Sequence, residues 1–102
     1  MIEVILTEEA ENDLVDIIEY IALDSPERAK KDAVELLTKA ENTISLFPLS
    51  SPFHSKEADI RRFSYQKYNI YYQYIESEKT AYLLHILNSA LIKNELLKNS
   101  GL

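Results

Sequence analysis

The sequence contains no cysteine and no tryptophan, and it has one glycine, three prolines and two histidines among its 102 residues. Without cysteine the chain has no disulfide, no zinc–thiolate site and no thiol nucleophile. The two histidines, His54 and His85, are far apart in the sequence, and no set of metal-ligating residues accompanies either of them. We therefore predict neither a metal site nor a bound cofactor.

Long hydrophobic runs are also missing. The apolar residues 1–6 form a short stretch that Glu8 and Glu9 follow almost at once, which is not the pattern of a signal peptide. No run approaches the roughly 20 apolar residues that a membrane-spanning helix needs. We expect a cytoplasmic protein without membrane contact, folded as a single domain over residues 1–102.

Basic residues are scarce, and the net charge is −6. An acidic chain is poorly suited to generic nucleic-acid binding, because cations are needed to displace the counterions of phosphates. Residues 1–50 hold 4 basic and 12 acidic residues (net −8), whereas residues 51–102 hold 7 basic and 5 acidic residues (net +2). The acid therefore gathers in the first half, and a small basic cluster of Arg61, Arg62 and Lys67 lies in the second.

Two amphipathic helices are predicted in the first half. Thr7 is suited to cap the first helix, which runs to about Leu23. Its apolar residues recur at helical spacing, at Ala10, Leu14, Ile17, Ile18 and Ile21. Ser25 and Pro26 begin the second helix, and Pro48 ends it because proline disfavours helical geometry in the residue before it. The short link between them predicts an antiparallel helical hairpin.

Strands are predicted on both sides of this hairpin. They are the β-rich runs 2–7, 59–65, 68–75 and 80–87. Residues 49–58 read as a loop, and residues 90–102 as a short C-terminal helix or a tail. The order β-α-α-β-β-β predicts a two-layer α+β domain with the hairpin on one face of a twisted, mainly antiparallel four-stranded sheet. The first strand is expected to pair beside the last.

Several segments in this order resemble the RelE/ParE superfamily of toxins from bacterial type II toxin–antitoxin modules. The segment "AENDLVDIIEYIA" is similar to the first helix of the family at Ala10, Asp13, Leu14, Ile17, Tyr20 and Ile21. The segment "LFP" resembles the end of its second helix, "YNIYYQY" its Tyr-Arg-Ile-x-Tyr strand, and "YLLHIL" its last strand. The resemblance covers roughly residues 2–88.

The resemblance implies a compact toxin that a cognate antitoxin neutralises by wrapping a segment over its surface, in a toxin–antitoxin hetero-oligomer. The RelE-like branch of the family cleaves mRNA in the ribosome with basic and acid–base side chains on the concave face of the sheet. The ParE-like branch poisons DNA gyrase and lacks the cleavage residues.

RNA cleavage requires a proton acceptor, cations for the developing negative charge, and a proton donor for the leaving oxygen. The candidates are Arg61, Arg62 and His85, and because the two arginines are adjacent in a strand only one can lie on the concave face. Strict alternation would place His85 on one strand face with Ala81, Leu83 and Leu87, where a packed, hydrogen-bonded histidine is the simpler interpretation. His54 and Glu57 are a further candidate acid–base pair, and an exposed polar loop explains them at least as well.

The sequence departs from the RelE-like pattern where cations are expected. Asn69 and His85 take positions of arginines in the family strands, and Asn88 and Ser89 replace residues that are typically His or basic. This favours a ParE-like toxin that binds an essential target, with gyrase suggested by the resemblance. The candidate target contacts are Arg62, Lys67, Asn69, His85 and Asn88. The alternatives are a RelE-like, ribosome-dependent mRNA endonuclease and a non-toxic homologue that still binds an antitoxin.

Overall fold

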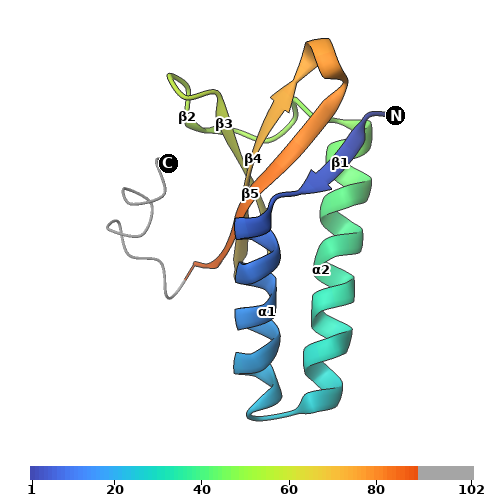
Figure 1. Cartoon of the computed structure of the whole chain (residues 1–102), viewed down its shortest axis with the longest axis vertical. Coiled ribbons are helices and arrows are strands. Elements are labelled where there is room, and N and C mark those ends of the chain that lie inside the picture. Colours follow the sequence, from blue (N-terminus) through green and yellow to red (C-terminus); the bar gives the residue numbers. More distant parts are fainter. Residues whose placement is uncertain (90–102) are drawn as a thin grey trace.

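The computed structural model describes residues 1–89, and the predicted C-terminal helix or tail lies outside the described residues. Within this range two α-helices and five strands follow one another along the chain. Figure 1 labels each of them. Their bounds are β1 Glu3–Leu6, α1 Glu8–Ala22, α2 Pro26–Leu46, β2 Phe53–Ser55, β3 Ile60–Tyr65, β4 Tyr68–Ile75 and β5 Thr80–Asn88, with a 3-10 turn at Glu76–Glu78 before β5.

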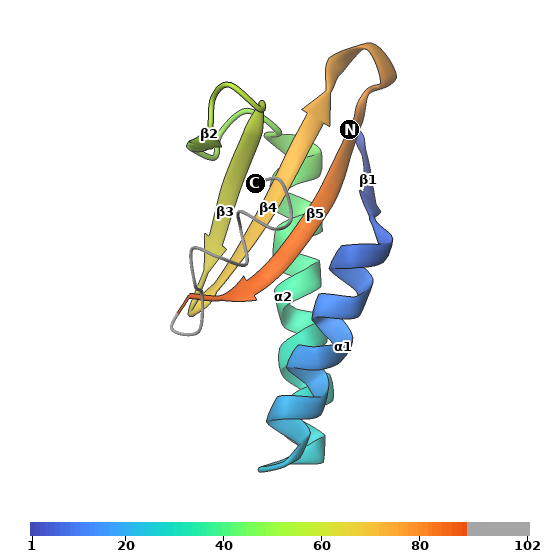
Figure 2. The same ribbon diagram turned by 60° about the vertical axis from the view of Figure 1, so that its left-hand side comes forward.

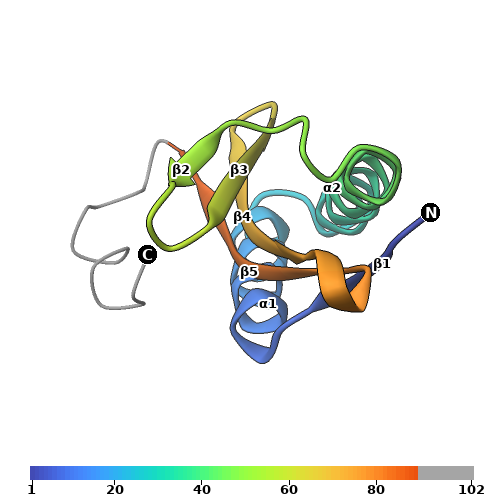
Figure 3. The ribbon, with the colours of Figure 1, turned by 90° about the horizontal axis from the view of Figure 1, so that it is seen from above.

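The strands form one sheet in the order β1-β5-β4-β3-β2. β1 runs parallel to β5, and the other neighbouring strands are antiparallel. In Figure 2, α2 passes behind β4 and β5 while α1 lies at the lower right below β1, and Figure 3 shows the strands fanning out beside the helices seen end-on. The predicted two-layer α+β fold is confirmed, as is the position of the first strand beside the last.

The sheet contains a fifth strand that the sequence did not indicate. Residues 53–55, predicted to lie in a loop, form β2 at the sheet edge and pair with β3, so that Phe53 lies opposite Arg61. β2 has only three residues, follows Pro52, and has an irregular register. Such a short segment carries no alternation of apolar and polar residues, so its pairing depends on β3 rather than on its own sequence.

The helix ends follow the predicted local signals. The side chain of Thr7 accepts a hydrogen bond from the Ala10 amide at 3.3 Å, and the side chain of Ser25 accepts one from the Arg28 amide at 3.2 Å. These bonds satisfy amides that would otherwise be unpaired in the first turn of each helix. Pro26 is the first residue of α2, which ends shortly before Pro48.

The core lies between the hairpin and the sheet. Tyr72, at 0% exposure, is one of its largest members, and its hydroxyl donates a hydrogen bond to the Pro48 carbonyl at 2.7 Å. Other buried members come from α2, β4 and β5, namely Leu36, Ala40, Ile44, Ile70, Leu83 and Ile86. Removal of this apolar surface from water is the main stabilising contribution. Neither helix is long and apolar enough to cross a membrane, in the part of the chain that the structure describes.

A β-bulge in β5 overturns the predicted face of His85. The register shifts between Tyr71, which pairs with His85, and Tyr72, which pairs with Leu83, so that Leu84 is an extra residue. Ala81 and Leu83 therefore pack toward the helices, whereas Leu84, Leu87 and Tyr71 belong to a second cluster on the opposite side. His85 shares a face with Tyr71, not with Ala81 and Leu83 as strict alternation predicted.

Buried tyrosines should make the fold sensitive to alkaline pH. Burial raises the pKa of the Tyr72 phenol above its usual value of 10.0, and burial likewise raises the pKa of Tyr68. The unfolded chain loses these phenolic protons near pH 10, while the folded chain keeps them. The two tyrosines therefore leave the free energy of unfolding unchanged below pH 10 and lower it above pH 10. Each retained proton contributes a slope of about 1.4 kcal/mol per pH unit.

Urea unfolding between pH 8 and pH 11 measures this decline. The matched control is Tyr72→Phe, which keeps the buried ring and has no phenolic proton. Its free energy of unfolding should fall less steeply above pH 10 than that of the wild type. Equal slopes for the two proteins would contradict the prediction.

Candidate functional site

The candidate site lies on the face of the sheet turned away from α1 and α2, which we call the distal face. Its centre is a row of three directly paired residues, Arg62 on β3, Tyr71 on β4 and His85 on β5, called the central row below. Arg62 is exposed, whereas Tyr71 is buried. Since neighbouring strands lie about 4.8 Å apart, the two ends of the row are about 10 Å apart at the backbone. The central row thus brings one guanidinium and one imidazole to the same face.

Arg61 lies away from this site. It pairs with Tyr72, and its guanidinium donates hydrogen bonds to the carbonyls of Leu49 at 3.1 Å and Ser51 at 2.8 Å. The same guanidinium stacks over the ring of Phe53, 4.0 Å from its centroid. Arg61 therefore fastens the segment between α2 and β2 to the sheet, and of the two candidate arginines only Arg62 belongs to the distal face.

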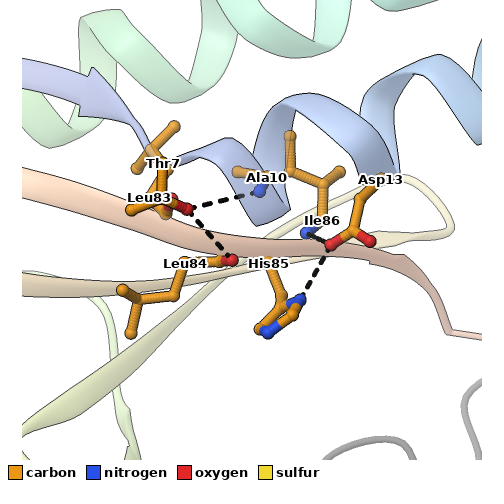
Figure 4. A network of polar contacts seen from close by, with 7 residues as sticks. All are labelled: Thr7, Ala10, Asp13, Leu83, Leu84, His85 and Ile86. Carbon is orange, nitrogen blue, oxygen red and sulfur yellow. Dashed lines mark hydrogen bonds and ion pairs between the residues drawn. The ribbon is translucent and has the colours of Figure 1, made fainter. Parts of the chain in front are cut away.

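His85 is held by Asp13, a residue of α1 that the site prediction did not include. Figure 4 shows the carboxylate beside β5, with one oxygen between two donors. Asp13 Oδ2 lies 2.9 Å from His85 Nδ1 and accepts a hydrogen bond from the Ile86 amide at 3.0 Å. The side chains of His85 and Asp13 are 15% and 21% exposed. An acidic residue on the apolar side of the first helix, three positions after Ala10, was the signal for this contact.

The edge of β5 explains why α1 supplies this carboxylate. β1 ends at Leu6, so on that edge β5 has no strand neighbour beyond Leu83. Residues at the start of α1 contact this edge of β5 in place of a strand. The Thr7 amide and hydroxyl both donate hydrogen bonds to the Leu83 carbonyl, at 3.1 and 2.8 Å. One turn further along the helix, Asp13 accepts from Ile86 (Figure 4). Backbone groups at the strand edge thus fix the position of the carboxylate against His85.

His54 joins the distal face through Tyr71. Their rings meet edge-on, with centroids 4.8 Å apart and planes inclined by 75°. Glu57, the predicted partner of His54, is exposed, and no ion pair between them is found within residues 1–89. The structure therefore places His54 beside the central row rather than in an acid–base pair with Glu57.

The remaining predicted contact residues are dispersed. Asn69 lies on the distal face, where its side-chain oxygen accepts a hydrogen bond from Ser64 at 2.8 Å. Lys67 lies in the turn between β3 and β4, with its ammonium 5.9 Å from the ring centroid of Tyr68. Asn88 pairs with Tyr68, whose side chain belongs to the core under the helices. Of the five predicted contact residues, the distal face therefore brings together Arg62, Asn69 and His85.

These features define a class of small α+β protein in which a helical hairpin covers one sheet face and supplies a side chain to the other. The sequence matches the family described as "ParE toxin of type II toxin-antitoxin system, parDE" over residues 4–90. Because the match spans most of the chain, the protein belongs to the ParE toxin family of type II toxin–antitoxin systems. No curated protein matches the sequence.

Similar solved structures are described as ParDE, RelBE2 and RelE toxins or toxin–antitoxin systems. The chromosomal ParDE toxin–antitoxin system of P. aeruginosa has 19% identity, a TM-score of 0.70, and coverage of 86% of this chain and 96% of that one. The RelBE2 complex of Mycobacterium tuberculosis has 19% identity, a TM-score of 0.66, and coverage of 85% and 90%. The isolated E. coli RelE toxin has 14% identity, a TM-score of 0.55, and coverage of 97% and 98%. At these identities the likeness is one of fold.

Proposed function

We propose that this protein arrests growth by binding an essential target through its distal face, with DNA gyrase as that target. The observation that carries the proposal is the charge of this face: Arg62 is there, whereas the guanidinium of Arg61 is occupied by the Leu49 and Ser51 carbonyls. By its resemblance to the family, Asn69 stands where an arginine is expected, and its side-chain oxygen accepts a hydrogen bond from Ser64. One guanidinium with the imidazoles of His54 and His85 is suited to binding a partner, whereas stabilising a cleaved phosphate requires several cations. The ParE family match supports the same branch.

We further propose that a cognate antitoxin neutralises the protein. The similar structures from P. aeruginosa and M. tuberculosis are described as toxin–antitoxin systems or complexes. On this chain the hairpin exposes apolar side chains that such a partner would bury, namely Val15, Tyr20, Leu23 and Val34. β1 and β2 at the sheet edges offer unpaired backbone groups as a second contact. The acidic first half favours an antitoxin segment of low acidity, since like charges across an interface are unfavourable.

A second candidate function is ribosome-dependent cleavage of mRNA. The contact of His85 with the Asp13 carboxylate favours it, because a histidine oriented by a carboxylate is an arrangement suited to proton transfer. Arg62, at the other end of the central row, would be the cation for the developing charge. Among the paired residues of β3, β4 and β5, this candidate has Arg62 alone as a lysine or arginine on the distal face.

Induced expression without an antitoxin tests the proposal first, followed by two assays on purified protein. The toxin should arrest growth, inhibit gyrase supercoiling and leave ribosome-bound mRNA intact. Cleaved mRNA with fully active gyrase would select the second candidate. Unchanged growth under verified expression would indicate a non-toxic homologue that retains only antitoxin binding.

A further inference from the structure

The contact between Asp13 and His85 determines which imidazole nitrogen carries a proton. An ionised carboxylate only accepts hydrogen bonds, so His85 Nδ1, 2.9 Å from Asp13 Oδ2, must be the donor. In a neutral imidazole the other nitrogen, Nε2, then has a free lone pair. Within residues 1–89 no hydrogen bond to Nε2 is found. In Figure 4 the ring lies on the far side of β5 from the start of α1.

We infer that Asp13 is a positioning residue for His85: it fixes the Nδ1–H tautomer and thereby presents Nε2 as a hydrogen-bond acceptor on the distal face. Arg62, at the other end of the central row, has a guanidinium that only donates. The site therefore fits a target surface on which a hydroxyl or N–H donor meets His85 and a carboxylate or another acceptor meets Arg62. This inference rests on the proposed function, because it specifies the chemistry of the target contact.

The position of Asp13 is fixed independently of His85. The same oxygen, Oδ2, accepts from the Ile86 amide, and Thr7 anchors the preceding turn of α1 to the Leu83 carbonyl. An amide oxygen accepts hydrogen bonds as a carboxylate oxygen does, so Asp13→Asn can keep both contacts. Asp13→Ala removes both. Asp16, exposed on the same helix three residues later, offers a matched control, Asp16→Ala.

Nitrogen NMR of the imidazole rings tests the positioning role directly. At an alkaline pH at which the imidazole signals no longer change, the wild type should show a proton on Nδ1 of His85 and none on Nε2. His54 is the second histidine and serves as the reference, and His85→Ala assigns the signals. Asp13→Ala should lose the single tautomer, while Asp13→Asn and Asp16→Ala should retain it. A wild-type His85 protonated on Nε2, or an unchanged spectrum in Asp13→Ala, would overturn the positioning role.

Growth arrest tests the role of the oriented imidazole, with thermal unfolding as the control for folding. Asp13→Ala and His85→Ala should lose arrest to the same degree, and the double variant should lose no more than either, because both changes remove one contact. Asp13→Asn, unlike Asp13→Ala, should arrest growth as the wild type does. A His85→Ala variant that arrests growth as the wild type does would overturn the target contact, whereas the spectra decide on the positioning role separately.

Discussion

Replacing Arg62 by alanine is expected to abolish growth arrest and to leave the fold intact. Arg62 is exposed, and no hydrogen bond or ion pair of its side chain is found within residues 1–89. Loss of such a surface side chain changes stability by about 0.5 kcal/mol or less. In a complex, truncation of one partner of a buried charged hydrogen bond costs about 2 kcal/mol or more, which weakens target affinity by about 30-fold. Growth after induction and the urea midpoint measure the two effects.

Arg61→Ala is the matched control for this experiment. The Arg61 guanidinium donates to two loop carbonyls and stacks on Phe53, so its removal should lower stability by about 2 kcal/mol. Growth arrest should persist at temperatures at which this variant remains folded. The assignment of the two arginines would be contradicted if Arg62→Ala arrested growth as strongly as the wild type. It would also be contradicted if a folded Arg61→Ala variant no longer arrested growth.

Replacing Tyr72 by alanine should unfold the protein or bring it close to unfolding. Tyr72 is fully buried under the hairpin, and its hydroxyl satisfies the Pro48 carbonyl beyond the end of α2. Truncation of a buried aromatic ring costs about 3–5 kcal/mol, and a domain is stable by only about 5–15 kcal/mol in total. Tyr72→Phe keeps the ring and should lose about 1 kcal/mol. A urea midpoint for Tyr72→Ala equal to that of Tyr72→Phe would show that the ring does not support the core.

The helices and the long strands were predictable because their signals are local. Thr7 and Ser25 cap the helices through bonds to amides three residues away, and Pro48 stops α2 through its own backbone geometry. The predicted strand 68–75 agrees with β4 at both ends, because its apolar and aromatic residues suit a pleated surface. These features require only neighbouring residues, and so the α+β architecture followed from the sequence.

The site was less predictable because it depends on contacts distant in sequence. Asp13 and His85 are 72 positions apart and meet only after β1 has paired with β5 and ended at Leu6. The bulge at Leu84, which brings His85 to the distal face, arises from the register between β4 and β5. Similarly, the commitment of Arg61 to the Leu49 and Ser51 carbonyls requires the folded segment before β2. None of these placements has a signature in a single segment.

The central claim is that this ParE-family protein arrests growth by binding a target through its distal face. That face has too few cations to cleave RNA. Titration of purified gyrase with the protein tests this most directly. We expect wild-type protein to inhibit supercoiling until the effect saturates, and Arg62→Ala at the same concentrations to leave gyrase active. Undiminished supercoiling at a large excess of wild-type protein that arrests growth in cells would contradict the account.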